Sequence, residues 1–409
     1  MLPHHHRRGD CRLCGSQILE RVLQLTPTPP ANSMVSAADC AVPQPVYPLD
    51  VYRCDGCGHL QLLDIVDPKL LFSHYVYVSS TSPVMVRYLQ EQCAAIIERA
   101  CLKPGDLVVE IGSNDGTLLR FFKAAGMRVL GVDPAANVVP DTSEIETLTD
   151  FFSADLGRQI REKYGPAQAI CAYNVCAHID DLRGVVDGVR ALIAPDGQFV
   201  FEVGYLLDVY RKTLFDTVYH EHVDFHHVEP LQGFFARCGL KLLHTERSDI
   251  QGGALVGYVG SPDRTEEASV AAMIADERAA GLHRADTFLT WSDMIRQRGE
   301  ELMALLRGLK AAGKSIAAYG APAKATTLMY HFGLDGSVLD YIVDDNPIKQ
   351  GMFTPGLHLP VLPVETLRER KPDYVVLLAW NFAESIVAKQ RGYMPHGRFV
   401  LPLPDLAIL

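Results

Sequence analysis

Short apolar runs alternate with amphipathic stretches between residues 85 and 245, which is the pattern of an α/β protein. Residues 107–111 form a short, mainly apolar run, which predicts a buried strand. A glycine-rich turn follows, and a helix is expected at residues 117–125. Residues 130–133 belong to a second apolar strand, which ends at Asp133. These elements form a β-α-β unit, and parallel strands of this kind bind ligands at their carboxyl ends.

The same alternation predicts further elements on both sides of this unit. Helices are expected at residues 84–101 and 182–192, and strands at residues 169–174 and 198–203. Lys103-Pro-Gly-Asp106 and Pro195-Asp-Gly197 are predicted turns, because glycine tolerates a positive φ. The result is a doubly wound parallel sheet.

A second α/β rhythm begins near the C-terminus. Strands are predicted at residues 314–319, 339–343 and 374–378, and a helix-prone segment at residues 268–309 precedes them. The pattern predicts a second Rossmann-like sheet, whose turn Gly320-Ala-Pro-Ala-Lys324 leads into a helix. A helix N-terminus favours phosphate, and Lys324 would add a positive charge to the same site. The alternative is a scaffolding domain in which Lys324 is merely solvated.

Four of the ten cysteines form two Cys-x-x-Cys pairs, Cys11-Arg-Leu-Cys14 and Cys54-Asp-Gly-Cys57. Each pair places two thiolates on one turn, and two such knuckles complete a tetrahedral sulfur site for zinc. Gly56 and Gly58 are expected to supply the positive φ that such turns need. Four protein ligands leave no open position, so a structural ion is predicted. A redox dithiol is the alternative for a single pair.

Length and charge narrow the class of protein. A chain of 409 residues predicts two or three domains. We expect a zinc-binding module at residues 1–70, the central sheet at 71–265, and a helical connector with the second sheet at 266–409.

The net charge of −11 disfavours non-specific binding of nucleic acid. The chain has no long apolar run and no apolar core behind its basic start, so neither a membrane span nor a signal peptide is expected. Cytoplasmic localisation is predicted.

The turn after the first strand has the sequence Glu110-Ile-Gly-Ser-Asn-Asp-Gly116. Its glycines let the backbone approach a ligand that a Cβ would push away. Asp133, at the end of the second strand, can accept hydrogen bonds from a ribose diol. The turn lacks the full Gly-x-Gly-x-x-Gly of dinucleotide sites and instead resembles that of the class I S-adenosylmethionine (SAM) methyltransferases. The alternative is a structural β-α-β unit without a ligand.

A second concentration of reactive side chains is Asp216-Thr-Val-Tyr-His-Glu-His222. A carboxylate between two histidines, beside a tyrosine, offers general bases and oxyanion donors in one short segment. Asn174 and His178 follow a predicted strand and should face the same crevice as the glycine-rich turn. The alternatives are a metal site that includes His226 and His227, and a packed segment with incidental histidines.

Taken in order, these motifs resemble the three-domain nucleotide-sugar C-methyltransferases of deoxysugar biosynthesis, across essentially the whole chain. The motifs are the two cysteine pairs, Tyr75-Val-Tyr77-Val-Ser-Ser80, Glu110-Ile-Gly-Ser-Asn-Asp-Gly116, Asn174-Val-Cys-Ala-His178, Tyr219-His-Glu-His222, Gly320-Ala-Pro-Ala-Lys324, Asp345-Asn-Pro-Ile-Lys-Gln-Gly351 and Trp380-Asn381. The resemblance implies a class I SAM domain between the zinc module and a nucleotide-sugar-binding Rossmann-like domain. It implies SAM and structural Zn²⁺ as cofactors. The implied reaction is methyl transfer, through an enolate, to C3 of a nucleotide-linked 4-keto-6-deoxyhexose, usually dTDP-linked.

The resemblance also implies roles for individual residues. His222 is the expected base, positioned or tuned by Glu221. Tyr219 and His178 are the expected donors to the enolate oxygen, and Tyr75 or Tyr77 is expected to contact the sugar or the cofactor. The expected cofactor-binding residues are Tyr77, Glu110, Gly112, Asn114, Gly116, Asp133 and Asn174. The expected substrate-binding residues are Lys324, His220, Phe225, Trp380 and Asn381, with Lys324 at the nucleotide end.

One departure concerns Asp224-Phe225, where the family pattern leads us to expect a Ser-Tyr pair. These positions are expected on the sugar side of the site, so the change bears on which sugar and which carbon are methylated. Two other classes remain open: a zinc-containing methyltransferase acting on RNA, protein or another sugar atom, and a nucleotide-sugar-binding protein without catalysis. The acidic balance counts against an RNA substrate, and the intact His222 and Tyr219 count against lost catalysis. No nucleic-acid or membrane partner is expected, and the oligomeric state stays open, with a monomer preferred.

Overall fold

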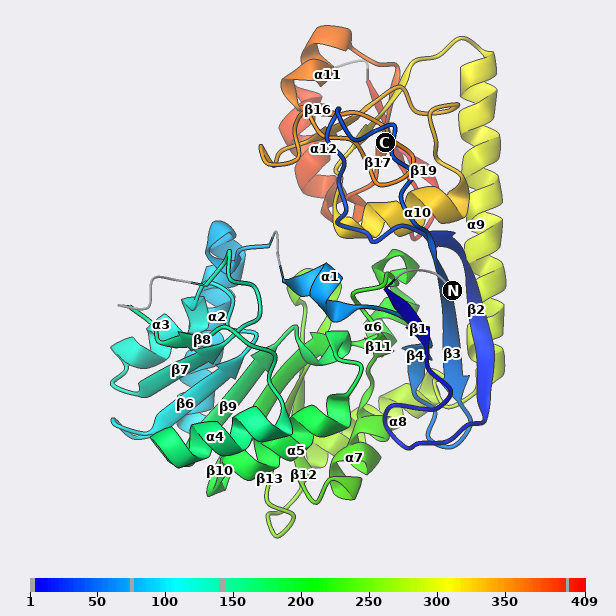
Figure 1. The fold of residues 1–409 in the computed structure, drawn as a ribbon. Helices are drawn as coiled ribbons and strands as arrows, with labels where there is room; N and C mark the ends of the chain where they lie inside the picture. The colour runs from blue at the N-terminus through cyan, green and yellow to red at the C-terminus, as the bar shows by residue number, and fades with distance from the viewer. Residues whose placement is uncertain (1–3, 74–76, 140–143, 395–396) are drawn as a thin grey trace.

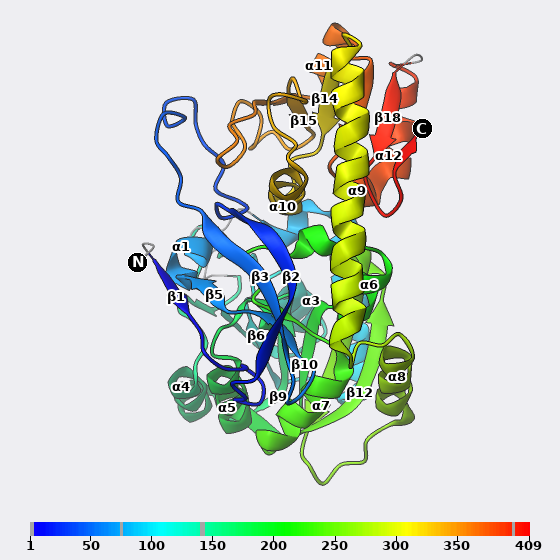
Figure 2. The same cartoon turned by 90° about the vertical axis from the view of Figure 1, so that its right-hand side faces the viewer.

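The computed structural model describes residues 4–73, 77–139, 144–394 and 397–409. Figures 1 and 2 show two α/β units at opposite ends of the long helix α9 (Ala285–Ala311). The N-terminal strands β2 (Leu19–Thr28) and β3 (Tyr47–Cys54) run alongside α9 and join the two units. None of the helices in the described part of the chain combines the length and the apolar composition needed to cross a bilayer.

The central unit is a seven-stranded sheet in the order β12-β13-β10-β9-β6-β7-β8. Its strands are β6 (Leu107–Ile111), β7 (Arg128–Val132), β8 (Thr147–Leu148), β9 (Ala167–Tyr173), β10 (Ile193–Gly204), β12 (Lys241–Ser248) and β13 (Ala254–Gly260). Strands β6 to β10 are parallel, and β13 is antiparallel to both of its neighbours. The strand order reverses between β6 and β9, which opens a crevice at their carboxyl ends.

Helices cover both faces of this sheet. Every residue of β6 is buried, and successive side chains point to opposite faces. Val108 packs in one core cluster with α2 and α3, whereas Val109 packs in another with α4, α5 and α7. The helices are α2 (Pro83–Arg99), α3 (Thr117–Ala124), α4 (Ala154–Tyr164), α5 (Leu182–Leu192) and α7 (Val228–Arg237). The predicted strand at residues 107–111 and the predicted helix at residues 182–192 are confirmed with the same bounds.

The predicted turn at residues 195–197 is wrong, because strand β10 runs through it. The register between β10 and β9 shifts between Ile193 and Gln198. Gly197 is not one of the glycines with a positive φ. A Cβ on Gly197 would lie 2.9 Å from the carbonyl oxygen of Ala167, so the glycine is needed for close strand approach instead of for turn geometry.

The C-terminal unit is a six-stranded sheet in the order β16-β15-β14-β17-β18-β19. Its strands are β14 (Ile316–Tyr319), β15 (Ile342–Asp344), β16 (Val361–Pro363), β17 (Tyr374–Leu377), β18 (Arg398–Leu401) and β19 (Ala407–Ile408), with β19 alone antiparallel. The order reverses between β14 and β17, which places the start of α10 (Ala323–Phe332) at a second crevice. This arrangement confirms the predicted second Rossmann-like sheet. The helix-prone segment before it forms two helices, α8 (Ala268–Ala279) and α9, and between them Gly281 takes a φ of +81°.

The N-terminal module is a four-stranded antiparallel sheet in the order β11-β4-β3-β2. Its edge strand β11 (Asp224–Phe225) comes from the central segment and pairs with β4 (Leu60–Leu62). A second small pair joins β1 (His5–Arg7) to β5 (Asp64–Val66), and α1 (Pro68–Phe72) follows. The zinc module therefore shares a sheet with the central unit, and the division at residues 70 and 265 stays a proposal.

Candidate active site and metal centre

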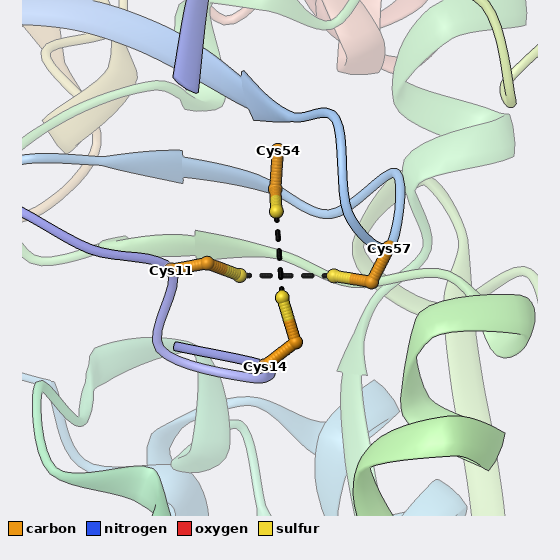
Figure 3. A group of neighbouring side chains, drawn as sticks. All are labelled: Cys11, Cys14, Cys54 and Cys57. Carbon is orange, nitrogen blue, oxygen red and sulfur yellow. Dashed lines mark hydrogen bonds between the residues drawn. The ribbon is translucent and has the colours of Figure 1, made fainter. Parts of the chain in front are cut away.

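The two cysteine pairs come together at the end of β3 (Figure 3). The Sγ atoms of Cys11, Cys14, Cys54 and Cys57 all lie within 4.8 Å of one another. Within the described residues this is the one cluster with metal-ligand chemistry, and it includes neither His226 nor His227. Four converging sulfurs fill a tetrahedral shell and leave no open position, so the cofactor held here is structural zinc.

The backbone folds each cysteine pair into a knuckle. The Gly15 N–H donates to the carbonyl of Cys11 at 2.8 Å, and the Gly58 N–H donates to the carbonyl of Cys54 at 2.8 Å. The φ angles of Gly15 and Gly58 are +75° and +81°, so the residue after each pair makes the left-handed turn. The expected positive φ at Gly56 is wrong. A Cβ there would lie 3.1 Å from Cβ of Ser16, so this glycine lets the two knuckles approach.

A cavity of about 1250 Å³ lies where the three modules meet. Its wall includes Asn32 from the N-terminal module, Gly112 and His222 from the central unit, and Lys324 and Asn381 from the C-terminal unit. Pockets for single small ligands usually have volumes of roughly 300–1,000 Å³. This cavity therefore has room for a cofactor and a second substrate side by side.

The glycine-rich turn after β6 forms one wall of the cavity. Gly112 has a φ of +69°, and a Cβ on it would lie 2.3 Å from Cγ2 of Val175. Asp133 lies on the same wall, where its carboxylate accepts the N–H groups of Asn114 and Ala135, both at 2.8 Å. These two bonds fix the carboxylate at the end of β7, where a ribose diol would reach it.

Glu110 provides a test of whether this wall fits a cofactor. Its carboxyl is buried on the cavity wall, and its Oε2 has no hydrogen-bond partner among the described residues. Burial raises the pKa of Glu110 well above its ordinary value, and the nearby charges of Asp133 and Asp115 raise it further. A buried acceptor without a donor fits a ligand that brings donors, such as the hydroxyl or ammonium groups of SAM.

Asn114 connects the turn to the segment before α2. Its side chain donates to the carbonyl of Tyr77 at 2.9 Å and accepts the N–H of Ser79 at 2.9 Å. Tyr77 lies on the cavity wall, as expected for a residue near the cofactor, and Tyr75 lies outside the described residues. Gly116 is not on the wall. It precedes α3 with a φ of +75°, so this glycine serves the turn.

Asn174 lies on the wall directly after β9, with a φ of +57°. Its side-chain N–H donates to Oε1 of Glu202 at 2.8 Å, and the Tyr88 hydroxyl donates to the other oxygen of the same carboxyl. Burial raises the pKa of Glu202 to about 7. Sequence reasoning missed Glu202 and Tyr88. The available signal was an acidic residue inside the apolar strand β10.

His178, Tyr219 and His222 meet on the cavity wall. The ring centroid of His222 lies 4.9 Å from that of His178 and 4.1 Å from that of Tyr219. Nδ1 of His222 is 2.7 Å from the carbonyl oxygen of Thr217, and Nε2 is 3.1 Å from the Tyr219 hydroxyl. A carbonyl only accepts, so Nδ1 carries the proton and Nε2 carries the lone pair. Burial lowers the pKa of His222 to about 4, which keeps the ring neutral at pH 7.

Glu221 does not hold the hydrogen bond that orients His222, although the family resemblance implies a positioning role for it. The orienting hydrogen bond comes from Thr217, whereas the Glu221 carboxyl accepts the side-chain N–H of Asn32 at 2.8 and 3.1 Å. Burial raises the pKa of Glu221 to about 7. Sequence reasoning missed Asn32, because it lies in a proline-rich loop without periodicity. Both residues lie on the cavity wall.

Lys324 lies on the C-terminal side of the wall and is not merely solvated, since its side chain is only 12% exposed. Its Nζ is 3.2 Å from Oδ2 of Asp216 and 4.2 Å from the centroid of the Trp380 ring. The indole N–H of Trp380 donates to the same carboxylate at 2.7 Å. Burial lowers the pKa of Lys324, and the charge of Asp216 opposes that shift. Trp380 is not on the wall, so it supports Lys324 from behind.

Two further residues complete the C-terminal side. Asn381 lies on the wall, as expected for a substrate-binding residue. Lys349, which sequence reasoning missed, also lies there, and its Nζ donates to the carbonyl of Ala321 at 2.7 Å. This bond brings a second lysine to the turn that precedes α10.

Besides Trp380, two further expected substrate-binding residues do not line the cavity. His220 lies against the start of β3, with Nε2 3.3 Å and 3.2 Å from the carbonyl oxygens of Tyr47 and Pro48. Phe225 is buried in β11. Its neighbour Asp224 lies 2.7 Å from Nε2 of His59. The departure from the expected Ser-Tyr pair therefore lies at the junction between the zinc module and the central unit, and not on the cavity wall.

Comparison with known proteins found both family models and solved structures that resemble parts of this chain. Three family models match successive parts of the chain: a putative zinc binding domain at residues 11–72, a methyltransferase domain at 85–245 and a C-methyltransferase C-terminal domain at 249–404. Among solved structures, magnesium protoporphyrin IX methyltransferase from Synechocystis is 13% identical with a TM-score of 0.33, covering 43% of this chain and 79% of its own. A SAM-dependent methyltransferase from Anabaena variabilis is 14% identical with a TM-score of 0.32, covering 47% of this chain and 99% of its own.

One relative extends along nearly the whole chain. C-methyltransferase NovU of Streptomyces niveus is 34% identical over 405 residues, which is 98% of this chain and 96% of the relative. The three matched regions have the order of the three modules that surround the cavity. With the four-cysteine cluster and the SAM-type turn, this similarity shows that the chain belongs to the C-methyltransferase family, as a zinc-binding enzyme that uses SAM.

Proposed function

We propose that the enzyme transfers the methyl group of SAM to C3 of a nucleotide-linked 4-keto-6-deoxyhexose, with dTDP as the nucleotide. The observation that supports this most is the single cavity that holds the glycine-rich turn, the His178–Tyr219–His222 cluster and the C-terminal lysines. In this proposal the cofactor lies against Glu110 and Asp133. The keto-sugar then lies against the histidine cluster.

The diphosphate belongs at the C-terminal side of the cavity. The N-terminus of α10, which favours an anion, lies there, and Lys324 and Lys349 add positive charge beside it. Asn381 on the same wall offers an amide that can bond to the nucleotide. This placement puts the two ends of the substrate on different modules.

His222 is the proposed general base. A C4 ketone acidifies the C3 hydrogen, and the Nε2 lone pair of neutral His222 takes that proton as the C3–H bond breaks. The electron pair moves onto the C4 oxygen as an enolate. Tyr219 must turn its O–H from Nε2 to this oxygen, which frees the lone pair and stabilises the new charge. His178 is the second proposed donor.

Bound SAM would supply an electrophilic methyl group. As the enolate electron pair forms the new bond from C3 to that methyl, the sulfur–methyl bond would break and S-adenosylhomocysteine would leave. His222 later releases its proton to water. Burial lowers the pKa of both His178 and His222, which keeps both rings neutral before the reaction. A neutral His178 does not repel the positive charge that His222 gains when it takes the proton. The buried, water-poor wall also strengthens the hydrogen bonds that hold the enolate.

Solvent-deuterium exchange tests this function. Wild-type enzyme with S-adenosylhomocysteine and a dTDP-4-keto-6-deoxyhexose should exchange the C3 hydrogen, which NMR reads as loss of the C3 proton signal. The His222→Asn variant should exchange no faster than buffer. The matched control is His244→Asn, because His244 lies on β12 against Ser269 and away from the cavity. Absence of exchange in wild-type enzyme that binds SAM would exclude this acceptor.

A further inference from the structure

The zinc module holds a buried arginine between two of its metal ligands. Arg12 lies in the knuckle Cys11-Arg-Leu-Cys14, and its side chain is 0% exposed. Both cysteines point their sulfur atoms into the four-cysteine cluster (Figure 3). The backbone at Arg12 is therefore fixed on both sides by the zinc site.

The guanidinium of Arg12 makes contacts well beyond the zinc module. Nη1 donates to the carbonyl of Leu62 at 2.6 Å and to that of Val223 at 3.3 Å. Nε donates to Oδ1 of Asp180 at 3.1 Å. Nη1 also lies 3.6 Å from Oδ1 of Asp224, whose side chain is 0% exposed. One side chain thus contacts β4 and two separate segments of the central unit.

Those two segments carry the proposed catalytic histidines. Val223 directly follows His222, and Asp180 lies two residues after His178. The segments also bond to each other, since the Val223 N–H donates to the carbonyl of Ala177 at 2.8 Å. Arg12 lies where they meet. A shift of either segment against the other would break at least one of its hydrogen bonds.

We propose that Arg12 is a positioning residue that sets the placement of His178 relative to His222, so that the zinc knuckle controls the geometry of the active site. The inference rests on the proposed roles of the two histidines. It also accounts for Asp224 in place of the serine that the family pattern predicts. A buried carboxylate requires a charged partner, which Arg12 supplies, and His59 adds a hydrogen bond to the same carboxylate.

The test separates positioning from stability. Arg12→Met alone leaves Asp224 buried and without its cation, so this variant should unfold more easily. The double variant Arg12→Met/Asp224→Asn removes that charge while His59 can still bond to position 224. The control is Arg21→Met, the same change in the same module, at a side chain that is 47% exposed and pairs with Asp50.

In the double variant, zinc content and SAM affinity should match those of wild type. Turnover should fall at least about tenfold with little change in the KM of the acceptor, because small misplacements of catalytic groups cost rate and not affinity. Arg12→Lys, which keeps the charge without the fork, should recover only part of the rate. Wild-type turnover in the double variant would overturn the proposal. So would a loss of turnover matched by equal losses of zinc and SAM binding.

A second readout does not depend on the substrate. With ¹⁵N-labelled histidine, the ring signals of His178 and His222 should shift in the double variant, whereas that of His331 on α10 should not. Unchanged signals for both catalytic histidines would overturn the positioning role. If wild-type enzyme fails the exchange experiment, the proposed substrate is wrong, and these spectra still decide the role of Arg12.

Discussion

Nζ of Lys324 lies 3.2 Å from Oδ2 of Asp216, and this ion pair joins the C-terminal unit to the segment that carries Tyr219 and His222. Helix α10, which carries Lys324, makes a second connection to this segment, since the Thr327 hydroxyl donates to the carbonyl of Val218 at 2.7 Å. Thr217, between the two contacts, orients His222 through its carbonyl. The proposed phosphate site and the proposed base are therefore held by one connected set of contacts.

Removing the charge of Lys324 should weaken both the fold and the binding of the nucleotide sugar. Lys324→Met leaves Asp216 buried and unpaired, which should cost roughly 3 kcal/mol in the free energy of unfolding. Urea unfolding measures this cost, and calorimetry measures the affinity for the nucleotide sugar.

The double variant Lys324→Met/Asp216→Asn should regain most of that stability, because the indole N–H of Trp380 can still donate to the asparagine. Affinity for the nucleotide sugar should stay low. Lys314→Met, at a half-exposed pair with Asp373, is the control and should change neither quantity. Wild-type affinity in the double variant would remove Lys324 from the phosphate site.

Asp133 should contribute to SAM affinity through its carboxylate. The two carboxylate oxygens of Asp133 each accept one backbone N–H group. Asp133→Asn keeps only one of these acceptors, so it loosens the turn and weakens any hydrogen bond to the ribose. SAM should bind about tenfold more weakly by calorimetry, which corresponds to one charge-assisted hydrogen bond. Asp106→Asn, at the opposite end of β6, is the control. Equal SAM affinity in both variants would show that Asp133 does not contact the ligand.

The buried Glu221 predicts a pH dependence of stability with a definite sign. Its folded pKa is about 7 and its ordinary value is 4.5, so the folded state holds the proton more tightly. The stability that this provides is present below pH 4.5 and is lost as the pH rises through 7. Glu221→Gln should therefore gain stability relative to wild type over that range, on the order of 3 kcal/mol at most. Urea unfolding across the range measures it.

The buried His220 predicts a pH dependence of stability with the opposite sign. Burial lowers its pKa from 6.5 to about 4, so the unfolded state binds the proton more tightly. Wild type should lose stability relative to His220→Gln as the pH falls from 6.5 to 4. The stability of Glu221→Gln relative to wild type should rise with pH, and that of His220→Gln should fall with pH. If both relative stabilities changed in the same direction with pH, at least one of the two side chains would not be buried as described.

Loss of zinc should unfold the N-terminal module. Cys54→Ser removes one of four sulfur ligands and so weakens zinc binding, and zinc content and the melting temperature should both fall. Cys40→Ser is the matched control, because Cys40 lies in the same module outside the cluster. A zinc-free Cys54→Ser protein with an unchanged melting temperature would contradict a structural role for the ion.

The strand, turn and helix at residues 107–124 and the zinc ligands could be predicted from the sequence alone. Apolar periodicity and Cys-x-x-Cys spacing are local signals, because they record which side chains face a core or share one turn. The second Rossmann-like sheet followed from the same kind of signal. Resemblance of the motifs then pointed to the class of reaction.

Only the tertiary structure decided which side chains meet. Arg12 with Asp180, Asn32 with Glu221, and Lys324 with Asp216 are pairs whose members lie far apart in the chain. Nothing in the local sequence encodes such a pair, since the contact depends on how three modules pack around one cavity. For the same reason His220 and Phe225, which the family resemblance places among the substrate-binding residues, pack against the zinc module instead. The sequence determined the elements and their chemistry, whereas packing determined which of those groups can act together.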